Sequence, residues 1–352
     1  MKIDGKTSHN SPSLRFPEFT GEWEKCKIED ITDAVSSGKS KNHFSNGEYN
    51  LYGSTGIIGR TDKALYDGKL VLVARVGANA GFLQIINEPC GITDNTLILK
   101  PKGIDAFYLY YFLQHFNLNR LIFGSGQPLI TGGMLKKVKV SLGTISEQSK
   151  IVKFLSLLDE RIAVQSRLID RLQSLMIGIA QKIAHSNKPN VRISDCLECS
   201  SSALQESEVN KTGKYPVYGA NGIVGYIDKY HTQNEAIYII KDGSGVGGVS
   251  YVTGKCSSTG TLNILQAKNG HSLKYLYYLL KVFNFVPYKT GMAIPHIYFK
   301  DYGKAKIFCP AYPEQLEYAK LLSSIDGNLR IALDSLKNFN LQKQYLLRHM
   351  LI

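Results

Sequence analysis

The cysteines are the first residues whose type and spacing could bind a metal ion. Cys196 and Cys199 have the C-x-x-C spacing that opens many zinc sites. No second cysteine pair or histidine pair follows at ligand spacing, so the sequence predicts no metal site. Cys90 and Cys256 occupy equivalent positions of an internal repeat, which indicates an inherited packing position. We expect reduced thiols at all six cysteines: Cys26, Cys90, Cys196, Cys199, Cys256 and Cys309.

A glycine-rich stretch at Asp242–Gly248 could cradle a phosphate group. It is not a P-loop, because no Lys-Ser or Lys-Thr closes it and no helical pattern follows. A turn between two strands explains its glycines. The chain also has no H-E-x-x-H, no G-x-S-x-G and no Asn-Pro-Pro-aromatic segment, and its eight histidines are scattered. The sequence therefore predicts a binding protein without catalytic residues and without a cofactor of its own.

The charge of the chain favours a polyanionic partner. The net charge is +13 and the isoelectric point is near 9.3, which points first to nucleic acid. The alternative is a basic protein with no such partner. The sequence has no run of 18 apolar residues that could span a membrane. Its polar N-terminus is unlike a signal peptide, so we expect a cytoplasmic location.

The chain contains an internal duplication. Tyr52–Gly59 (YGSTGIIG) returns 166 residues later as Tyr218–Gly225 (YGANGIVG), and Glu147-Gln148 returns 167 residues later as Glu314-Gln315. Strand-like apolar runs followed by glycine-rich turns also match, as do two aromatic stretches of helical character, Phe107–Gln114 and Leu273–Leu280. The aromatic side chains are expected in the core. This overlay places the one-residue step between the copies after the aromatic stretch, and it predicts two homologous α+β domains.

Each copy ends in a long heptad pattern typical of a coiled coil. In the first copy the apolar residues are Ile151, Leu155, Leu158, Ile162, Ile169, Leu172, Met176, Ile179 and Ile183. In the second copy they are Tyr318, Leu322, Ile325, Leu329, Ala332, Leu336, Phe339, Leu346 and Met350. Gln165 and Lys343 are the polar interruptions.

Two such helices would leave their apolar stripes in water unless something covers them. A helix of about 37 residues rises about 55 Å, and the simplest cover is the other long helix. We expect an antiparallel pair with one domain at each end, related by an approximate two-fold axis. The alternative is that each helix packs only on its own domain. The expected boundaries are 1–146 and 186–313 for the domains, and 147–185 and 314–352 for the helices.

Two unlike domains on a rigid spacer would suit a bipartite, asymmetric site on double-stranded DNA. B-DNA advances about 34–36 Å per turn, within the reach of such a spacer. Base edges are read chiefly by Arg, Lys, Asn and Gln, while basic residues also hold phosphates. Arg75 and Lys241 share one repeat position, which suggests a shared phosphate contact. The candidate DNA-binding residues are Lys39, Lys41, Asn42, Arg60, Arg75, Asn79, Gln127, Asn221, Lys241, Ser244, Lys289 and His296.

Over almost its whole length the chain resembles the specificity subunit of type I restriction–modification systems. The resemblance rests on Leu14-Arg15-Phe16-Pro17-Glu18-Phe19 followed by Trp23, on the two Tyr-Gly-x-x-Gly-x-x-Gly segments, and on the Glu-Gln pairs that open the long helices. It implies that each domain is a target recognition domain and that the helices form an antiparallel coiled coil that fixes the gap between two half-sites.

The resemblance also implies partner proteins. Two methyltransferase subunits would bind this subunit, and two motor-nuclease subunits would complete the restriction enzyme. S-adenosylmethionine, ATP and magnesium would belong to those partners. Two other classes of protein stay open on the residues alone. A stand-alone nuclease would need a cluster of metal-binding carboxylates, which neither copy repeats. A coiled-coil structural adaptor would not need the +13 charge or two diverged domains.

Overall fold

The computed structural model describes residues 11–41, 46–123 and 128–352. The chain forms two compact units. Unit 1 comprises Met1–Gln165 and Ser335–Ile352, and unit 2 comprises Ser166–Asp334. In the described part of the chain, no helix is both long and apolar enough to cross a bilayer.

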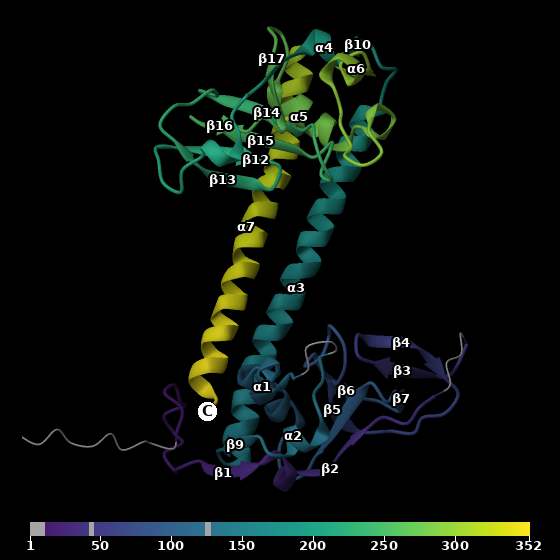
Figure 1. Ribbon diagram of the computed structural model, residues 1–352, viewed down its shortest axis with the longest axis vertical. Coiled ribbons are helices and arrows are strands. Elements are labelled where there is room, and N and C mark those ends of the chain that lie inside the picture. Colours follow the sequence, from purple (N-terminus) through teal and green to yellow (C-terminus); the bar gives the residue numbers. More distant parts are fainter. Residues whose placement is uncertain (1–10, 42–45, 124–127) are drawn as a thin grey trace, which may run out of the picture. The chain divides into compact units, whose positions relative to one another are not determined.

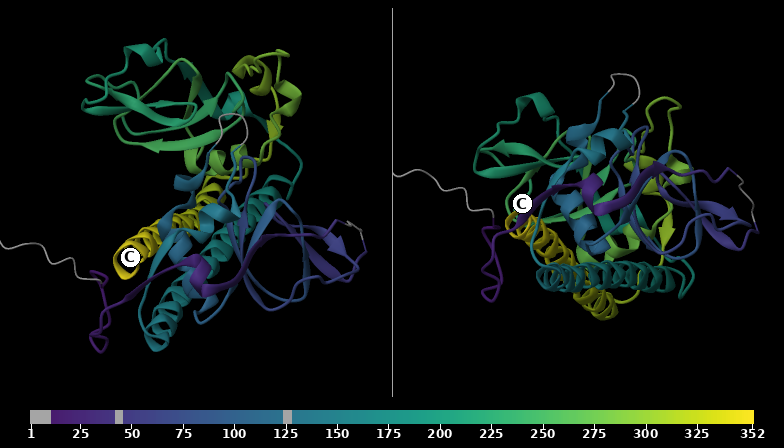
Figure 2. Two further views of the ribbon diagram at one scale, coloured as in Figure 1. Left: turned by 60° about the horizontal axis from the view of Figure 1, so that its bottom comes forward. Right: turned by 90° about the horizontal axis from the view of Figure 1, so that it is seen from below.

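Unit 1 is built on three small sheets (Figure 1). The four-stranded sheet has the order β2-β8-β5-β6, with bounds Thr32–Ser37, Thr96–Pro101, Lys69–Ala74 and Leu83–Asn87. The three-stranded sheet has the order β4-β3-β7, with bounds Gly56–Thr61, Tyr49–Gly53 and Cys90–Ile92. It lies on the side of the larger sheet away from α1 (Figures 1 and 2). The third sheet pairs β1 (Glu24–Lys27) with β9 (Lys139–Leu142).

Short helices connect these strands. They are η1 (Ile28–Ile31), α1 (Ala106–Phe116), η2 (Leu118–Leu121) and α2 (Gly132–Lys136). Helix α1 begins where the Asp105 carboxylate accepts the Phe107 N–H, and it ends at Asn117 in the left-handed conformation. Leu109, Phe112 and Leu113 of α1 lie in the same buried cluster as Val71 and Val73 of β5, so α1 packs on the larger sheet.

Unit 2 repeats this arrangement strand for strand. Its sheets have the orders β11-β17-β14-β15, β13-β12-β16 and β10-β18, which match the three sheets of unit 1. The strand bounds are β10 Val191–Arg192, β11 Leu197–Ser201, β12 Tyr215–Gly219, β13 Gly222–Ile227, β14 Glu235–Ile240, β15 Val249–Thr253, β16 Ser257–Ser258, β17 Leu262–Ala267 and β18 Lys306–Ile307. The short helices are α4 Ile193–Cys196, η3 Glu206–Glu208, α5 Leu273–Val282, η4 Val286–Tyr288 and α6 Phe299–Tyr302. The predicted duplication and α+β class are confirmed.

The central strands are buried on both faces, which explains their continuous apolar sequences. In β5, Val71 and Val73 face the α1 core, whereas Leu70 and Leu72 face a second cluster that contains Cys90. Cys256 is buried in the equivalent cluster of unit 2. Both thiols are therefore packing residues, as the repeat predicted. The expectation that the aromatic stretches belong to the core is also confirmed, since Tyr108, Tyr111, Tyr275 and Tyr278 are buried.

The one-residue difference between the two copies lies before the aromatic helices α1 and α5, whereas the sequence overlay placed it after them. The Tyr108 hydroxyl donates to Ser141 O, and the Tyr275 hydroxyl donates to Phe308 O. These pairs match at an offset of 167 residues, whereas the strand before each helix matches at 166. The loop into α5 is therefore one residue longer than the loop into α1. A loop accepts such an insertion without disturbing the core.

Two long helices complete the fold, α3 (Ile145–Ala184) and α7 (Tyr312–Met350). The first part of α3 and the last part of α7 belong to unit 1, and the remaining parts belong to unit 2. The pairing is therefore antiparallel, as predicted. In unit 1, Ile151, Leu155 and Leu158 share a buried cluster with Leu346 and Met350. The cluster also contains Tyr108 and Tyr111 of α1, so the start of α3 and the end of α7 pack on each other and on the domain of unit 1.

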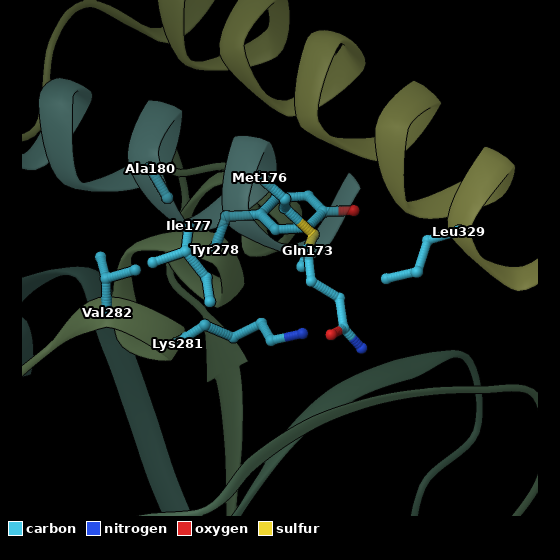
Figure 3. A pocket seen from close by; sticks show the side chains of 8 residues that line it. All are labelled: Gln173, Met176, Ile177, Ala180, Tyr278, Lys281, Val282 and Leu329. Atoms are coloured by element: carbon cyan, nitrogen blue, oxygen red, sulfur yellow. The ribbon is translucent and has the colours of Figure 1, made fainter. Parts of the chain in front are cut away.

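The other predicted seam residues are also buried or half-buried. Buried are Ile169, Met176 and Ile183 of α3, and Leu322, Ile325, Leu329 and Ala332 of α7. Half-buried are Ile162, Leu172, Ile179, Tyr318, Leu336 and Phe339. In unit 2, Met176, Tyr278 and Leu329 surround a cavity of about 210 Å³ (Figure 3). Here too the helix pair packs on its domain.

The glutamine of each Glu-Gln pair joins its domain to the long helix, and it makes equivalent hydrogen bonds in both units. The Gln148 amide donates to Gly143 O at 2.9 Å and accepts the Asp105 N–H at 3.3 Å. The Gln315 amide makes the equivalent bonds to Pro310 O and from the Ser272 N–H, at 2.9 and 2.8 Å. Each buried side chain therefore ties the start of its long helix to the start of the aromatic helix.

Candidate nucleic-acid interface

The glycine-rich turns after β5 and β14 are held by the same backbone hydrogen bonds. In unit 1 the Arg75 N–H donates to Asn95 O at 2.9 Å, and Arg75 O accepts the Ile130 N–H at 2.8 Å. In unit 2 the matching bonds, at 3.0 and 2.9 Å, join Lys241 to Thr261 and Ile297. The sequence predicted that Arg75 and Lys241 are equivalent, and the two backbones agree.

The next residue of each turn differs in chemistry on this shared backbone. In unit 1, Val76 forms an isolated bridge with Leu129. In unit 2, Asp242 forms the equivalent bridge with His296, and their side chains pair through Oδ1 and Nδ1 at 2.7 Å. Both side chains are 35% exposed, so polar atoms remain open to a ligand. A carboxylate can accept a hydrogen bond from a base edge where Val76 offers only apolar contact.

The Arg75 side chain has donors to spare. It is half-buried, and its Nη1 donates weakly to Asp94 O at 3.5 Å. Its Nε is buried without a hydrogen-bond partner among the described residues. A guanidinium with unused donors is suited to a phosphate oxygen. Lys241 is half-buried as well. It lies near Cys199, where burial raises the pKa of the thiol to about 11 and the charge of Lys241 opposes that rise.

A hollow of about 670 Å³ in unit 1 brings several predicted residues together. Lys39 and Lys41 lie in its wall and are exposed. Asp94 and Asn95, which hold Arg75, line the same hollow. The lining residues in the described part of the chain are Gly38, Lys39, Ser40, Lys41, Ile58, Thr93, Asp94 and Asn95. This wall of lysines, backbone groups and short polar side chains has the chemistry to bind a phosphate or a base edge.

The other candidates among the described residues do not line this hollow. Arg60 is exposed on β4 and donates to Gly47 O at 3.4 Å, so part of its role is internal. Asn79 and Ser244 are exposed in the glycine-rich turns, and Asn221 is exposed in the turn between β12 and β13. Lys289 is exposed after η4. The candidates Asn42 and Gln127 lie outside the described residues.

The sequence search missed four residues of this region. Asp242 is not among the candidates, because base edges are read chiefly by Arg, Lys, Asn and Gln, although its contrast with Val76 is visible when the copies are aligned. Thr93, Asp94 and Asn95 follow β7 and reach the hollow only through the order of the strands, for which the sequence holds no local signal.

One cluster in the described part of the chain has the residue types of a metal site. It joins Cys196 to His271 and Cys309, all in unit 2. The second cysteine of the C-x-x-C segment, Cys199, is not a member, because it lies on β11.

The profile of the family described as type I restriction modification DNA specificity domain matches this chain twice, at residues 20–174 and 186–338. The chain belongs to this family, as the sequence motifs predicted. The two matches correspond to the two copies of the internal repeat.

Two curated relatives are described as specificity subunits of type I restriction enzymes. The chain is 25% identical over 123 residues to a type I restriction enzyme specificity subunit of Haemophilus influenzae. This matched segment covers 34% of this chain and 32% of that protein. It is 28% identical over 112 residues to the type I restriction enzyme EcoprrI specificity subunit of Escherichia coli, which covers 32% of this chain and 28% of that protein. The matched segments span about a third of the length of these relatives.

Solved structures share the fold. The chain is similar to the S subunit of the type I restriction–modification system from M. genitalium, with a TM-score of 0.73, 19% identity, and coverage of 97% of this chain and 99% of that chain. A chain from a structure described for complex assembly and conformational transition of the type I R-M system has a TM-score of 0.55 and 12% identity, and covers 94% of this chain and 97% of that chain. At these identities the likeness shows the fold alone.

Proposed function

We propose that this chain is a non-catalytic specificity subunit that recognises a bipartite, asymmetric site on double-stranded DNA. Residues 1–146 and 186–313 would each act as a target recognition domain that reads one half-site. The observation that carries the proposal is the shared turn with unlike side chains, Val76 and Leu129 in one unit and Asp242 and His296 in the other. A common backbone with different polar groups supports reading of two different half-sites.

The basic residues supply binding that does not depend on sequence. The net charge of +13 favours association with phosphates, and Arg75 and Lys241 sit at equivalent places beside the unlike pairs. In this proposal Arg75 and Lys241 bind the phosphate backbone of DNA, while Asp242 and His296 of unit 2 read a base edge. Lys39, Lys41, Asn79, Asn221, Ser244 and Lys289 are exposed and fit either role.

The partner proteins would bind the long helices. In unit 1, α3 exposes the apolar side chains Phe154, Leu157 and Val164. A groove of about 230 Å³ lies beside them, lined by Phe154, Leu157, Leu158, Arg161, Gln342 and Leu346. An exposed apolar row on a coiled coil supports docking of another helix. We assign it to the methyltransferase subunit, and S-adenosylmethionine, ATP and magnesium to the methyltransferase and motor-nuclease partners.

Lengthening the two long helices tests the proposed recognition of a bipartite DNA site. One heptad is inserted in α3 after Gln165 and one in α7 after Asp334, so that the antiparallel register is kept. Seven residues add about 10 Å, which corresponds to about three base pairs. We expect the unread gap in the methylated sequence to grow by about that number while both half-sites stay the same. Methylation is mapped by genome sequencing in cells that carry the partner subunits.

Cells without this chain are the control, and they should lack the methylation pattern. An altered half-site with an unchanged gap would contradict the assignment of the helices as spacer. A methylation pattern that persists without the chain would contradict the proposed function altogether.

A further inference from the structure

Three side chains from separate segments of unit 2 meet at one point. Cys196 ends α4, His271 directly precedes Ser272, the N-cap of α5, and Cys309 lies three residues before α7 begins. Their thiol sulfurs and a ring nitrogen of His271 all lie within 4.8 Å of one another. The segments are far apart in sequence, so the meeting is a product of the fold.

The cluster is buried, and one of its polar atoms is left unsatisfied. Cys196 is fully buried and Cys309 is 9% exposed. The Nδ1 atom of His271 is buried and has no hydrogen-bond partner among the described residues. A buried polar atom without a partner destabilises a fold unless something else binds it.

Unit 1 shows that the fold itself does not need polar residues here. The Ile31 carbonyl accepts the Lys102 N–H, just as the Cys196 carbonyl accepts the Lys268 N–H. Ile104 precedes the N-cap of α1, as His271 precedes that of α5. Leu142 follows the carbonyl that binds Tyr108, as Cys309 follows the carbonyl that binds Tyr275. The counterparts of the cluster, Ile31, Ile104 and Leu142, all belong to one hydrophobic core.

The backbone around Cys309 is fixed from both sides. The Asn190 side chain accepts the Cys309 N–H and donates to Cys309 O, each at 2.8 Å. The Cys196 backbone is fixed by the Lys268 N–H at 2.9 Å. The backbone that carries both thiols is therefore held in place before anything binds, which lowers the cost of ordering the site.

We propose that Cys196, His271 and Cys309 bind a thiolate-preferring divalent metal ion of the zinc type. Two sulfurs at about 2.3 Å and one nitrogen at about 2.0 Å from a tetrahedral ion lie roughly 3.5–3.8 Å apart, which the cluster can reach with small side-chain movements. Both thiols release a proton on binding, so the ion and its two thiolates carry no net charge. The three side chains supply three ligands, so a water molecule would take the fourth position of a tetrahedral site.

A bound ion would tie α4, the start of α5 and the approach to α7 together, at the joint that Gln315 also holds. The proposal concerns this joint and does not depend on DNA recognition.

Metal binding by the reduced full chain tests the proposal. The probes are Zn²⁺ and Co²⁺ alone, followed by metal analysis after buffer exchange and by absorption spectroscopy. We expect one ion per chain. With Co²⁺ we expect a thiolate-to-cobalt charge-transfer band and the visible bands of a tetrahedral site. Zinc should displace cobalt and raise the melting temperature of unit 2.

The repeat supplies a variant that should fold without the site. Cys196→Ile, His271→Ile and Cys309→Leu together install the residues of unit 1. This triple variant should bind no metal and should keep its circular dichroism spectrum. Cys199→Ser is the matched control, because Cys199 belongs to the C-x-x-C segment but not to the cluster, and it should bind one ion like the parent chain.

Three outcomes would overturn the proposal. The first is that the reduced chain binds neither ion. The second is that the triple variant keeps the metal, or that Cys199→Ser loses it. The third is a Cys196–Cys309 disulfide that forms in place of metal binding even when zinc is in excess, as detected by mass spectrometry of the unreduced protein.

Discussion

Glu147 and Glu314 open the two long helices at equivalent positions, yet their surroundings are opposite. Glu147 is fully buried and accepts hydrogen bonds from Arg15 Nε and Nη2 at 2.7 and 2.8 Å, and from the Trp23 indole at 3.1 Å. Glu314 is exposed and accepts the hydroxyl of Tyr318 at 2.7 Å. The neighbouring glutamines, by contrast, make the same hydrogen bonds in both units.

The difference comes from the segment before the first copy. Leu14 donates its N–H to His349 O at 2.8 Å, so this segment lies beside the end of α7. From there it brings Arg15 and Trp23 over Glu147. A duplicated joint can thus keep the residue that fixes its geometry while the adjacent carboxylate takes on a new partner.

The largest expected effect is the loss of stability when the buried carboxylate of Glu147 loses its cationic partner. Arg15→Met should destabilise unit 1 by about 3 kcal/mol, because it removes the cation and leaves Glu147 buried with only the indole N–H. Trp23 is the only tryptophan of the chain and lies in this core, so its fluorescence during urea unfolding reports on unit 1.

Tyr318→Phe is the matched control, since it removes the partner of Glu314. The loss in unit 2 should stay within about 0.5 kcal/mol, because the bond is exposed. Its unfolding is followed by circular dichroism. Equal losses in the two variants would show that burial does not distinguish the two carboxylates.

The next effect concerns the unlike pairs of the glycine-rich turns. Asp242→Val with His296→Leu gives unit 2 the side chains of unit 1. We expect preference at one base position of one half-site to fall by about 10- to 100-fold, since a good base contact is worth about 1–3 kcal/mol. Binding to duplex libraries with either half-site randomised measures this, and the other half-site should not change.

Two single variants separate base reading from phosphate binding. Arg75→Ala and Lys241→Ala should each weaken binding to all sequences alike and reduce the salt slope by about one. An unchanged slope would remove that residue from the phosphate contacts. A library profile unaffected by the double swap would remove Asp242 and His296 from the base contacts.

The smallest expected effect lies in the helix seam. Lys343 pairs with Asp159 at 2.6 Å, and the repeat-equivalent residue of unit 2 is Met176, which is buried. Lys343→Met should cost less than about 1 kcal/mol, because the pair is partly exposed and Tyr111 still donates to Asp159. A double-mutant cycle with Asp159→Asn measures the coupling between Lys343 and Asp159. The same cycle on Arg330 and Asp326, a pair at 2.8 Å in which the arginine side chain is exposed, should give almost no coupling. A coupling well above 1 kcal/mol would show that Lys343 is a required part of the seam.

A large part of the fold could be predicted from local patterns in the sequence. The heptads from Ile151 and from Tyr318 predicted two long helices that pack on each other, because each helix must cover its apolar stripe. The repeat predicted the equivalence of Arg75 and Lys241. The overlay placed the single-residue step on the wrong side of the aromatic helix, because a loop insertion leaves no trace in the flanking apolar pattern.

The site was harder to predict, because its members come from distant strands. Lys39 and Lys41 were candidates for their charge, but nothing in the sequence placed them beside Asp94 and Asn95. The C-x-x-C segment suggested Cys199 as the partner of Cys196. The fold instead carries Cys199 into β11 and brings His271 and Cys309 to Cys196.

The sequence by itself determined the duplication, the α+β class and the two coiled-coil helices, because each follows from periodicity along the chain. Only the tertiary structure decided that Glu147 is buried while Glu314 is exposed, that Asp242 pairs with His296, and that two cysteines and a histidine meet. Those arrangements depend on strand order and on contacts between residues far apart in the chain, and no local pattern encodes such contacts.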